Sequence, residues 1–147
     1  MPETTVRIVL LGPNDGGLLA DVDPDVFDEV VRPDLVREVL TDPRHHLAVA
    51  IDGTRVVGFA SGVHYVHPDK PAELWINEVG VASSHRGRGL AKELLSALFE
   101  VGVRVGCRQA WVLTERDNVP ARRLYASVGG REATEEITMF EFRLDVP

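Results

Sequence analysis

The sequence contains a single cysteine and no long hydrophobic run. Cys107 has no partner for an internal disulfide, which fits the reducing cytoplasm. Nowhere do about 18 apolar residues follow one another, so no membrane-spanning helix is expected. The short apolar run at 6–11 follows no basic stretch, and no signal peptide is predicted. Internal repeats and low-complexity tracts are absent too, so residues 1–147 are expected to form one domain.

An excess of basic charge is also lacking, because the formal net charge is -7. This balance argues against a nucleic-acid partner, since phosphate backbones attract basic surfaces. The charge is unevenly distributed along the chain. Residues 21–42 hold eight acidic side chains and two arginines, whereas residues 85–123 hold eight basic and four acidic ones. The first segment is therefore suited to a cation and the second to an anion.

The spacing of apolar residues switches between the periods of strands and helices. Pro24 and Pro33 are expected to divide residues 14–42 into two short helices, and Asp52-Gly53 is typical of a hairpin turn. Strands are predicted at 6–11, 47–51, 57–65, 74–81, 110–114 and 137–144, with further helices at 89–105 and 119–128. This order predicts an α/β (α+β) domain with a mixed sheet.

A basic, glycine-rich turn leads from the strand at 74–81 into the long helix. Gly87 and Gly89 let the backbone wrap closely around an anion, while Arg86 and Arg88 add positive charge beside a helix N-terminus. The plain alternative is a helix start with solvated arginines. A Walker loop would end in Gly-Lys-Ser/Thr, and a dinucleotide fold would place its glycine turn after the first strand of a βαβ unit, so neither fits.

Two motifs carry a resemblance to a known family. Arg86-Gly87-Arg88-Gly89-Leu90-Ala91 resembles the Arg/Gln-x-x-Gly-x-Gly/Ala signature of the GNAT superfamily of N-acetyltransferases. Asn118, Ala121, Leu124 and Tyr125 resemble the Asn-x-x-Ala-x-x-x-Tyr helix of that family. The resemblance implies the GNAT fold, with a mixed, mostly antiparallel central sheet flanked by helices, and acetyl-CoA as the cosubstrate.

The resemblance also implies how acetyl-CoA would be held. The turn would bind its pyrophosphate, and the strand backbone around Gly80 would pair with its pantetheine arm, although a glycine that only serves packing is the alternative there. Asn118 would cap its helix and hold a pantetheine amide. The cofactor-binding residues predicted in this way are Val79, Gly80, Val81, Arg86, Gly87, Arg88, Gly89, Leu90, Ala91, Asn118, Ala121 and Tyr125.

Two side chains are predicted to be catalytic. Glu78 is a carboxylate in a strand expected to be central, where burial would raise its pKa and suit it as a general base. Its alternatives are a structural role and the anchoring of a cationic substrate. Tyr125 would, by the resemblance, protonate the departing thiolate, and its alternative is a buried aromatic residue. Cys107 lacks an activating neighbour, so direct attack by the acceptor amine is expected.

A narrower resemblance is to the GNAT-type aminoglycoside 3-N-acetyltransferases. It rests on residues 11–13, 79–86, 120–125 and 131–142 and implies a small cationic amine as acceptor, with aminoglycosides and hence antibiotic resistance as the first candidates. The acidic segment 21–42 would attract such a cation, unless it is only a solvated helical face. The competing functions are acetylation of a protein lysine or N-terminus and a non-catalytic acyl-CoA-binding module.

The remaining expectations concern partners and packing. Members of the GNAT family often dimerise, so a homodimer is compatible with the resemblance, whereas no nucleic-acid or membrane partner is expected. No metal site is predicted, because neither His45-His46 nor His64 with His67 can jointly hold a metal. Phe99 and the two tryptophans, at 75 and 111, are expected to serve packing.

Overall fold

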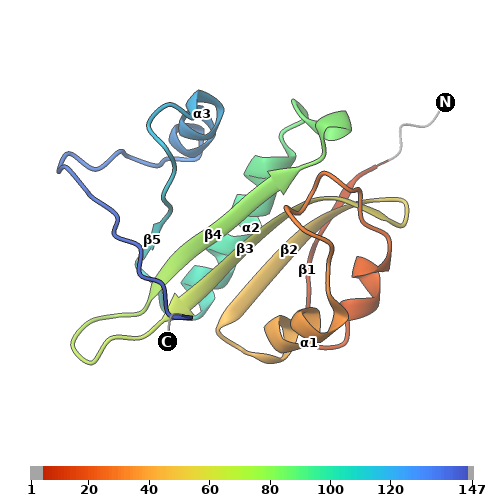
Figure 1. Cartoon of the computed structure of the whole chain (residues 1–147), viewed down its shortest axis with the longest axis horizontal. Helices are drawn as coiled ribbons and strands as arrows, with labels where there is room; N and C mark the ends of the chain where they lie inside the picture. Colours follow the sequence, from red (N-terminus) through yellow and green to blue (C-terminus); the bar gives the residue numbers. More distant parts are fainter. Residues whose placement is uncertain (1–4, 146–147) are drawn as a thin grey trace. The chain divides into compact units, whose positions relative to one another are not determined.

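A five-stranded sheet with the order β1-β2-β3-β4-β5 forms the centre of the computed structural model, which describes residues 5–145 (Figure 1). Its strands are β1 Arg7–Leu10, β2 His45–Asp52, β3 Arg55–Tyr65, β4 Glu73–Val81 and β5 Gln109–Trp111. Neighbouring strands are antiparallel except β4 and β5, which are parallel. The predicted mixed, mostly antiparallel sheet is therefore confirmed.

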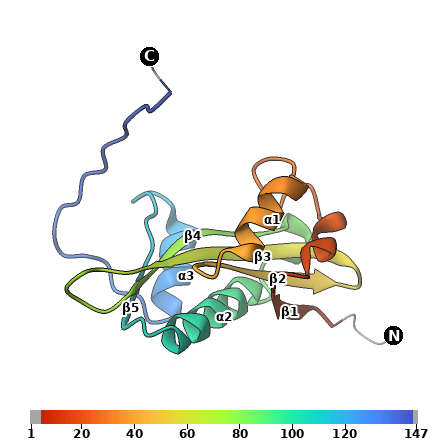
Figure 2. The ribbon, with the colours of Figure 1, turned by 90° about the horizontal axis from the view of Figure 1, so that it is seen from below.

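Helices cover both faces of this sheet, as Figure 2 shows. The long helix α2 (Leu90–Arg104) packs on one face, here called the α2 face, through buried side chains at the predicted three- to four-residue spacing. The 3-10 helix η1 (Gly16–Ala20) and the helix α1 (Pro33–Thr41) lie on the opposite face, the α1 face. A short 3-10 turn, η2 (Ser83–His85), connects β4 to α2.

A bulge between β3 and β4 decides which side chains share the α1 face. Glu78 pairs with Ser61, whereas Ile76 already pairs with Gly62, so Asn77 is the extra residue. Side chains of paired residues point to the same face of a sheet. Glu78 and Trp75 therefore both follow β3 onto the α1 face, although an odd number of positions separates them.

The prediction of two short helices in residues 14–42 is only partly right. Pro33 does begin an α-helix, but the earlier piece is a single 3-10 turn, and residues 21–32 contain no helix. The backbone of this stretch bonds instead to β3. Val56 donates its N–H to the carbonyl of Asp21 at 2.9 Å and accepts from the N–H of Asp23 at 2.9 Å. The backbone N–H and C=O groups that would have bonded within a helix therefore bond to a strand.

The chain divides into two compact units, Met1–Leu113 and Thr114–Pro147. The second unit contains the helix α3 (Val119–Ser127), close to the predicted range. The expected strand at 137–144 is wrong, because that segment has no hydrogen-bonded strand partner. An alternating pattern of apolar residues does not form a strand without a neighbouring strand to bond to. Between residues 5 and 145, no helix is long and apolar enough to cross a membrane. A single domain stays a prediction.

Candidate functional site

The turn between η2 and α2 has the backbone conformation that its glycines permit. Gly87 has φ 78° and Gly89 has φ 79°, both in the left-handed region that favours glycine. A Cβ at either position would meet nothing within 4 Å, so conformation and not crowding requires these glycines. Gly89 caps α2 without a side chain, and the N–H groups of Leu90 and Ala91 have no partner within the helix. The turn therefore presents open space beside unpaired donors.

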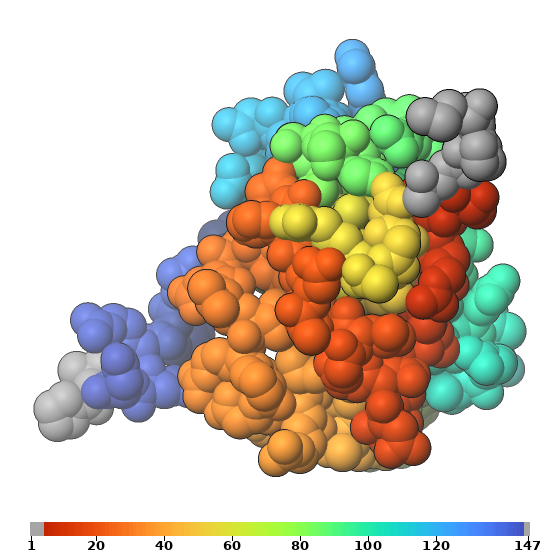
Figure 3. Space-filling view, turned by 90° about the vertical axis from the view of Figure 1, so that its right-hand side faces the viewer, coloured from red at the N-terminus to blue at the C-terminus, as the bar shows by residue number. Residues whose placement is uncertain are grey.

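Acidic side chains from elsewhere in the first unit hold this turn in place. Asp25 accepts a hydrogen bond from the N–H of Ser83 at 2.9 Å, and Asp52 lies 2.7 Å from the Nε2 of His85. The N–H of Ser83 is the main reason why the pKa of Asp25 is lowered to about 2. Figure 3 shows the tip of the β2–β3 hairpin, in yellow, against the green segment after β4. Part of the acidic segment thus has a structural role.

Arg86 also has a structural contact. Its Nε donates to the carbonyl of Val81 at 3.1 Å, which closes the turn back onto the end of β4. The side chain of Arg86 is exposed, as is that of Arg88. Both residues directly precede the start of α2 in the chain, and their positive charge favours an anion at that end of the helix.

The second half of β4 extends beyond its neighbour β5. The pairing with β5 covers only Glu73–Trp75, whereas β4 continues to Val81. Within the described residues, the edge of 76–81 that faces away from β3 has no strand partner. Gly80 lies in this half, and a Cβ there would stand 2.7 Å from the carbonyl oxygen of Val26. Packing alone therefore requires this glycine, and the free edge of β4 is available for another extended chain.

A pocket of about 570 Å³ opens on the α1 face. Phe27, whose ring centroid lies 4.1 Å from that of Phe59, forms part of an apolar wall together with residues of α1. The polar part of the lining comes from Asp28, Glu29, Arg32, His45, His46, Ser61, Asn77 and Glu78. The lining therefore combines apolar surface with three carboxylates and one arginine, whose guanidinium is paired with Asp34 at 2.7 Å, and the excess of negative charge favours an organic cation.

Glu78 is exposed, so the expectation of a buried carboxylate is wrong. The reason is the pocket itself: the neighbour of Glu78 on β3 is the small Ser61, and Glu78 lines the pocket on the α1 face. Glu78 still points into the pocket beside the half of β4 that has no β5 partner. Its position fits a group that touches an acceptor, although burial does not prepare it for proton transfer.

The second predicted motif lies in the unit Thr114–Pro147. Asn118 caps α3, because its Oδ1 accepts from the N–H of Ala121 at 3.1 Å, and this part of the prediction is confirmed. Burial raises the pKa of Tyr125, which keeps its phenol protonated at neutral pH. The raised pKa makes Tyr125 a weaker acid. Tyr125 belongs to the second unit, whereas Glu78 and the glycine turn belong to the first.

The surroundings of Cys107 and of the two tryptophans bear on two further sequence predictions. Burial, followed by the charge of Glu73, raises the pKa of the Cys107 thiol, which agrees with the expectation that it is not a nucleophile. Trp75 and Trp111 do not lie in the core. Trp111 is 39% exposed, and its ring centroid lies 3.9 Å from that of Trp75. The two indole rings still pack against each other, so the expected packing role is met, but at a position outside the core.

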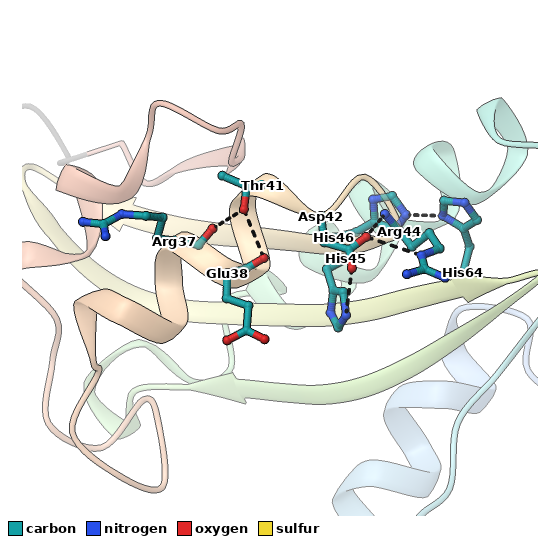
Figure 4. A network of polar contacts seen from close by, with 8 residues as sticks. All are labelled: Arg37, Glu38, Thr41, Asp42, Arg44, His45, His46 and His64. Carbon is teal, nitrogen blue, oxygen red and sulfur yellow. Dashed lines mark hydrogen bonds and ion pairs between the residues drawn. The ribbon is translucent and has the colours of Figure 1, made fainter.

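A histidine pair was not foreseen from the sequence. His46 on β2 and His64 on β3 point toward one another, with 2.8 Å between Nε2 of the first and Nδ1 of the second (Figure 4). Burial and the neighbouring His64 lower the pKa of His46 to about 4. Only the strand register brings the two residues together, since His46 pairs with Gly62. Sequence spacing contains no signal for such a contact.

Comparison with known proteins identifies the class that this fold and site define. The acetyltransferase (GNAT) family profile matches residues 18–129, and the chain belongs to this family. It is an N-acetyltransferase whose cosubstrate is acetyl-CoA, as is usual in the family. An uncharacterized N-acetyltransferase, YycN, of Bacillus subtilis (strain 168) is 30% identical over 75% of this chain and 70% of its own length.

Two further relatives differ in what they are named for. An L-2,4-diaminobutyric acid acetyltransferase of Streptomyces anulatus is 36% identical over 60% of this chain, which spans only 51% of that protein. An aminoglycoside acetyltransferase, HMB0005, from an uncultured soil metagenomic sample has a similar structure, with a TM-score of 0.79 and 24% identity over 96% of this chain and 99% of that one. The structural likeness supports the shared fold.

Proposed function

We propose that this N-acetyltransferase acetylates a primary amine of a small cationic acceptor bound in the pocket on the α1 face. The observation that carries the proposal is the group of three carboxylates, from Asp28, Glu29 and Glu78, beside the apolar wall of a pocket that contains a single arginine. An ammonium group would find opposite charge there, and the carbon skeleton would find apolar surface. Aminoglycosides, named in several structural neighbours, are the first acceptors to test.

The first unit offers a suitable place for the pyrophosphate of acetyl-CoA. Arg86, Gly87, Arg88, Gly89, Leu90 and Ala91 would surround it with unpaired N–H groups and positive charge. The free edge of β4, at Val79, Gly80 and Val81, would pair with the pantetheine arm, and one N–H there would polarise the thioester carbonyl. Asn118 and Ala121 of the second motif keep the cofactor-binding role that the family resemblance implies.

Glu78 would start the chemistry as a general base. Its carboxylate takes a proton from the acceptor ammonium, directly or through one water, so that the free amine attacks the thioester carbonyl. A C–N bond forms, the nitrogen loses its second proton, and the C–S bond breaks to leave a thiolate that takes up a proton. Tyr125 keeps the predicted role of donor to the thiolate and is reprotonated by the proton that leaves the nitrogen, although burial raises its pKa and makes it a weaker acid. A phenol has a pKa of about 10 and a thiol of about 8.5, so this transfer requires a short hydrogen bond.

Substitution of Glu78 tests the proposal. Glu78→Gln should lower kcat by about 100-fold or more, because general-base catalysis usually contributes that much, and should leave the KM for acetyl-CoA unchanged. Asp28→Asn is the matched control: it removes an equal charge from the same pocket, and it should raise the acceptor KM with little effect on kcat. Release of the free thiol from acetyl-CoA measures both constants.

The choice of acceptor is tested with a panel of aminoglycosides, spermidine, 2,4-diaminobutyrate and lysine-containing peptides. Turnover of a small cation with a higher kcat/KM than any peptide is the expected result. Peptides that outcompete every small amine would favour acetylation of a protein, and equal turnover by wild type and Glu78→Gln would refute the role of Glu78. A homodimer, and the absence of nucleic acid and membrane from the reaction, stay predictions.

A further inference from the structure

A group of aromatic and acidic side chains lies on the α1 face beyond the pocket. We call it the aromatic cluster, and it consists of Tyr65, Glu73, Trp75 and Trp111. The indole N–H of Trp111 donates to the hydroxyl of Tyr65 at 2.6 Å, and that hydroxyl donates to Glu73 at 2.9 Å. The cluster therefore holds a carboxylate beside three aromatic rings.

The cluster begins where the pocket ends. Trp75 donates its indole N–H to the side-chain oxygen of Asn77 at 3.3 Å, and Asn77 lines the pocket beside Glu78. The bulge at Asn77 is what places Trp75 on the same face as Glu78. Pocket and cluster thus form one continuous strip of the α1 face, with a carboxylate near each end.

The carboxylate of the cluster stays ionised. The hydroxyl of Tyr65 is the main reason why the pKa of Glu73 is lowered, and His67, 3.2 Å from the same oxygen, contributes further. The side chain of Glu73 is 23% exposed, and Trp111 is 39% exposed. Part of the aromatic surface and part of the carboxylate are therefore exposed, which is the composition that attracts an ammonium ion through cation–π and ionic contacts.

From this arrangement we infer that the aromatic cluster binds a second ammonium group of the acceptor, while the first is presented to Glu78. The inference rests on the proposed function. The β3 partners of the two glutamates are Ser61 and Tyr65, so at ~3.3 Å per residue the backbone positions of the two glutamates lie about 13 Å apart along the strand. The acceptor class is then an elongated di- or polyamine. A short diamine such as 2,4-diaminobutyrate cannot reach both ends.

The two tryptophans of the cluster are the only two in the chain, so intrinsic fluorescence reports directly on it. Spermine, an elongated and non-absorbing polyamine, should change this fluorescence with a saturable dependence on concentration. Glu73→Gln and Trp75→Leu should each raise the spermine Kd roughly 3- to 30-fold, the range expected from a lost cation–π or ionic contact. Trp75→Phe keeps an aromatic face and should retain most of the affinity.

Asp69→Asn is the matched control for Glu73→Gln. It removes one negative charge from the turn between β3 and β4, where Asp69 contacts only Lys70 and is 70% exposed. Its spermine Kd should change less than about 2-fold, because exposed charges contribute little. Thermal unfolding of each variant separates lost binding from lost fold, and Glu73→Gln is close enough in shape to remain folded.

Several outcomes would overturn the inference. Spermine without effect on the fluorescence, equal affinity in Glu73→Gln and wild type, or equal effects of Glu73→Gln and Asp69→Asn would each do so. Failure of the proposed function looks different. If Glu78→Gln abolishes acetylation while Glu73→Gln does not weaken the binding of spermine, only the second subsite is refuted. If spermine binds at the cluster but no amine is acetylated, the binding site is supported and the proposed acceptor class is refuted.

Discussion

The Nε2 atom of His85 lies 2.7 Å from Oδ2 of Asp52, and this contact joins the turn before α2 to the tip of the β2–β3 hairpin. The other ring nitrogen lies 2.7 Å from the hydroxyl of Ser84. The side chain of His85 is only 14% exposed. The turn proposed to hold the pyrophosphate is thus positioned by a hydrogen bond to a hairpin 33 positions earlier in the chain.

Loss of this contact should weaken the binding of acetyl-CoA. Asp52→Ala leaves His85 without its acceptor, so we expect a 3- to 10-fold higher KM for acetyl-CoA, from a hydrogen bond of about 1 kcal/mol, with kcat nearly unchanged. His85→Gln should retain part of the affinity, because an amide can donate to Asp52. Steady-state kinetics measure both constants. A lower melting temperature with an unchanged KM would show that the contact serves only stability.

Alanine at Gly89 separates the conformation of the turn from general stability. The left-handed φ of this residue costs a side chain about 1–2 kcal/mol, and adjustment of the turn should also raise the KM for acetyl-CoA. Gly106 is the matched control, since it follows the other end of α2 with φ 89° and open space around it. Gly106→Ala should lose similar stability in urea unfolding and leave the KM unchanged. Equal KM values in the two variants would contradict the proposed pyrophosphate site.

Substitution of Gly80 by alanine tests how closely the backbone at Val26 approaches β4. The new methyl group would stand 2.7 Å from the carbonyl of Val26 and 3.0 Å from the ring of Phe59. Overpacking of this kind usually destabilises by about 1–3 kcal/mol. Gly17→Ala, at an exposed position where a Cβ meets nothing within 4 Å, should leave the free energy of unfolding nearly unchanged. Chemical denaturation of the two variants gives the comparison.

The half-buried His46 on β2 should make stability depend on pH. The fold lowers the pKa of His46 from 6.5 to about 4, so between these values the unfolded chain binds more protons than the folded one. The contribution is complete above pH 6.5 and is lost as the pH falls toward 4. His46→Gln should therefore show a smaller loss of melting temperature between pH 7 and pH 5 than wild type. His45→Gln, at the exposed neighbouring position, is the control, and an unchanged slope in His46→Gln would refute the assignment.

Local chemistry accounts for the elements that could be predicted from the amino-acid sequence. The stripe of Leu90, Leu94 and Leu98 determines α2, because burial at helical spacing is a short-range pattern. The β2–β3 hairpin follows from Gly53, whose φ of 65° few other residues adopt. The Asn118 cap depends on residues only three positions apart. In each case the interacting groups are close together in the chain.

Long-range pairing accounts for the features that could not be predicted. The bulge at Asn77 sets the direction of Trp75 and Glu78, and nothing in the order of residues in β4 reveals it. Two backbone hydrogen bonds join Asp21 and Asp23 to Val56, so an extended segment forms where a helix was expected. The donor and the acceptor come from a strand in another part of the chain.

Residue identity alone sufficed for the family, the acetyl donor and the glycine turn, because short motifs encode backbone conformation and local charge. Only the folded structure shows that Glu78 is exposed, that Asp52 anchors the turn before α2 and that Glu73 belongs to the proposed cation-binding cluster. These properties depend on which strands lie side by side and on what covers them. Burial and electrostatic environment are set by neighbours that are distant in the chain, and only the folded arrangement brings those neighbours together.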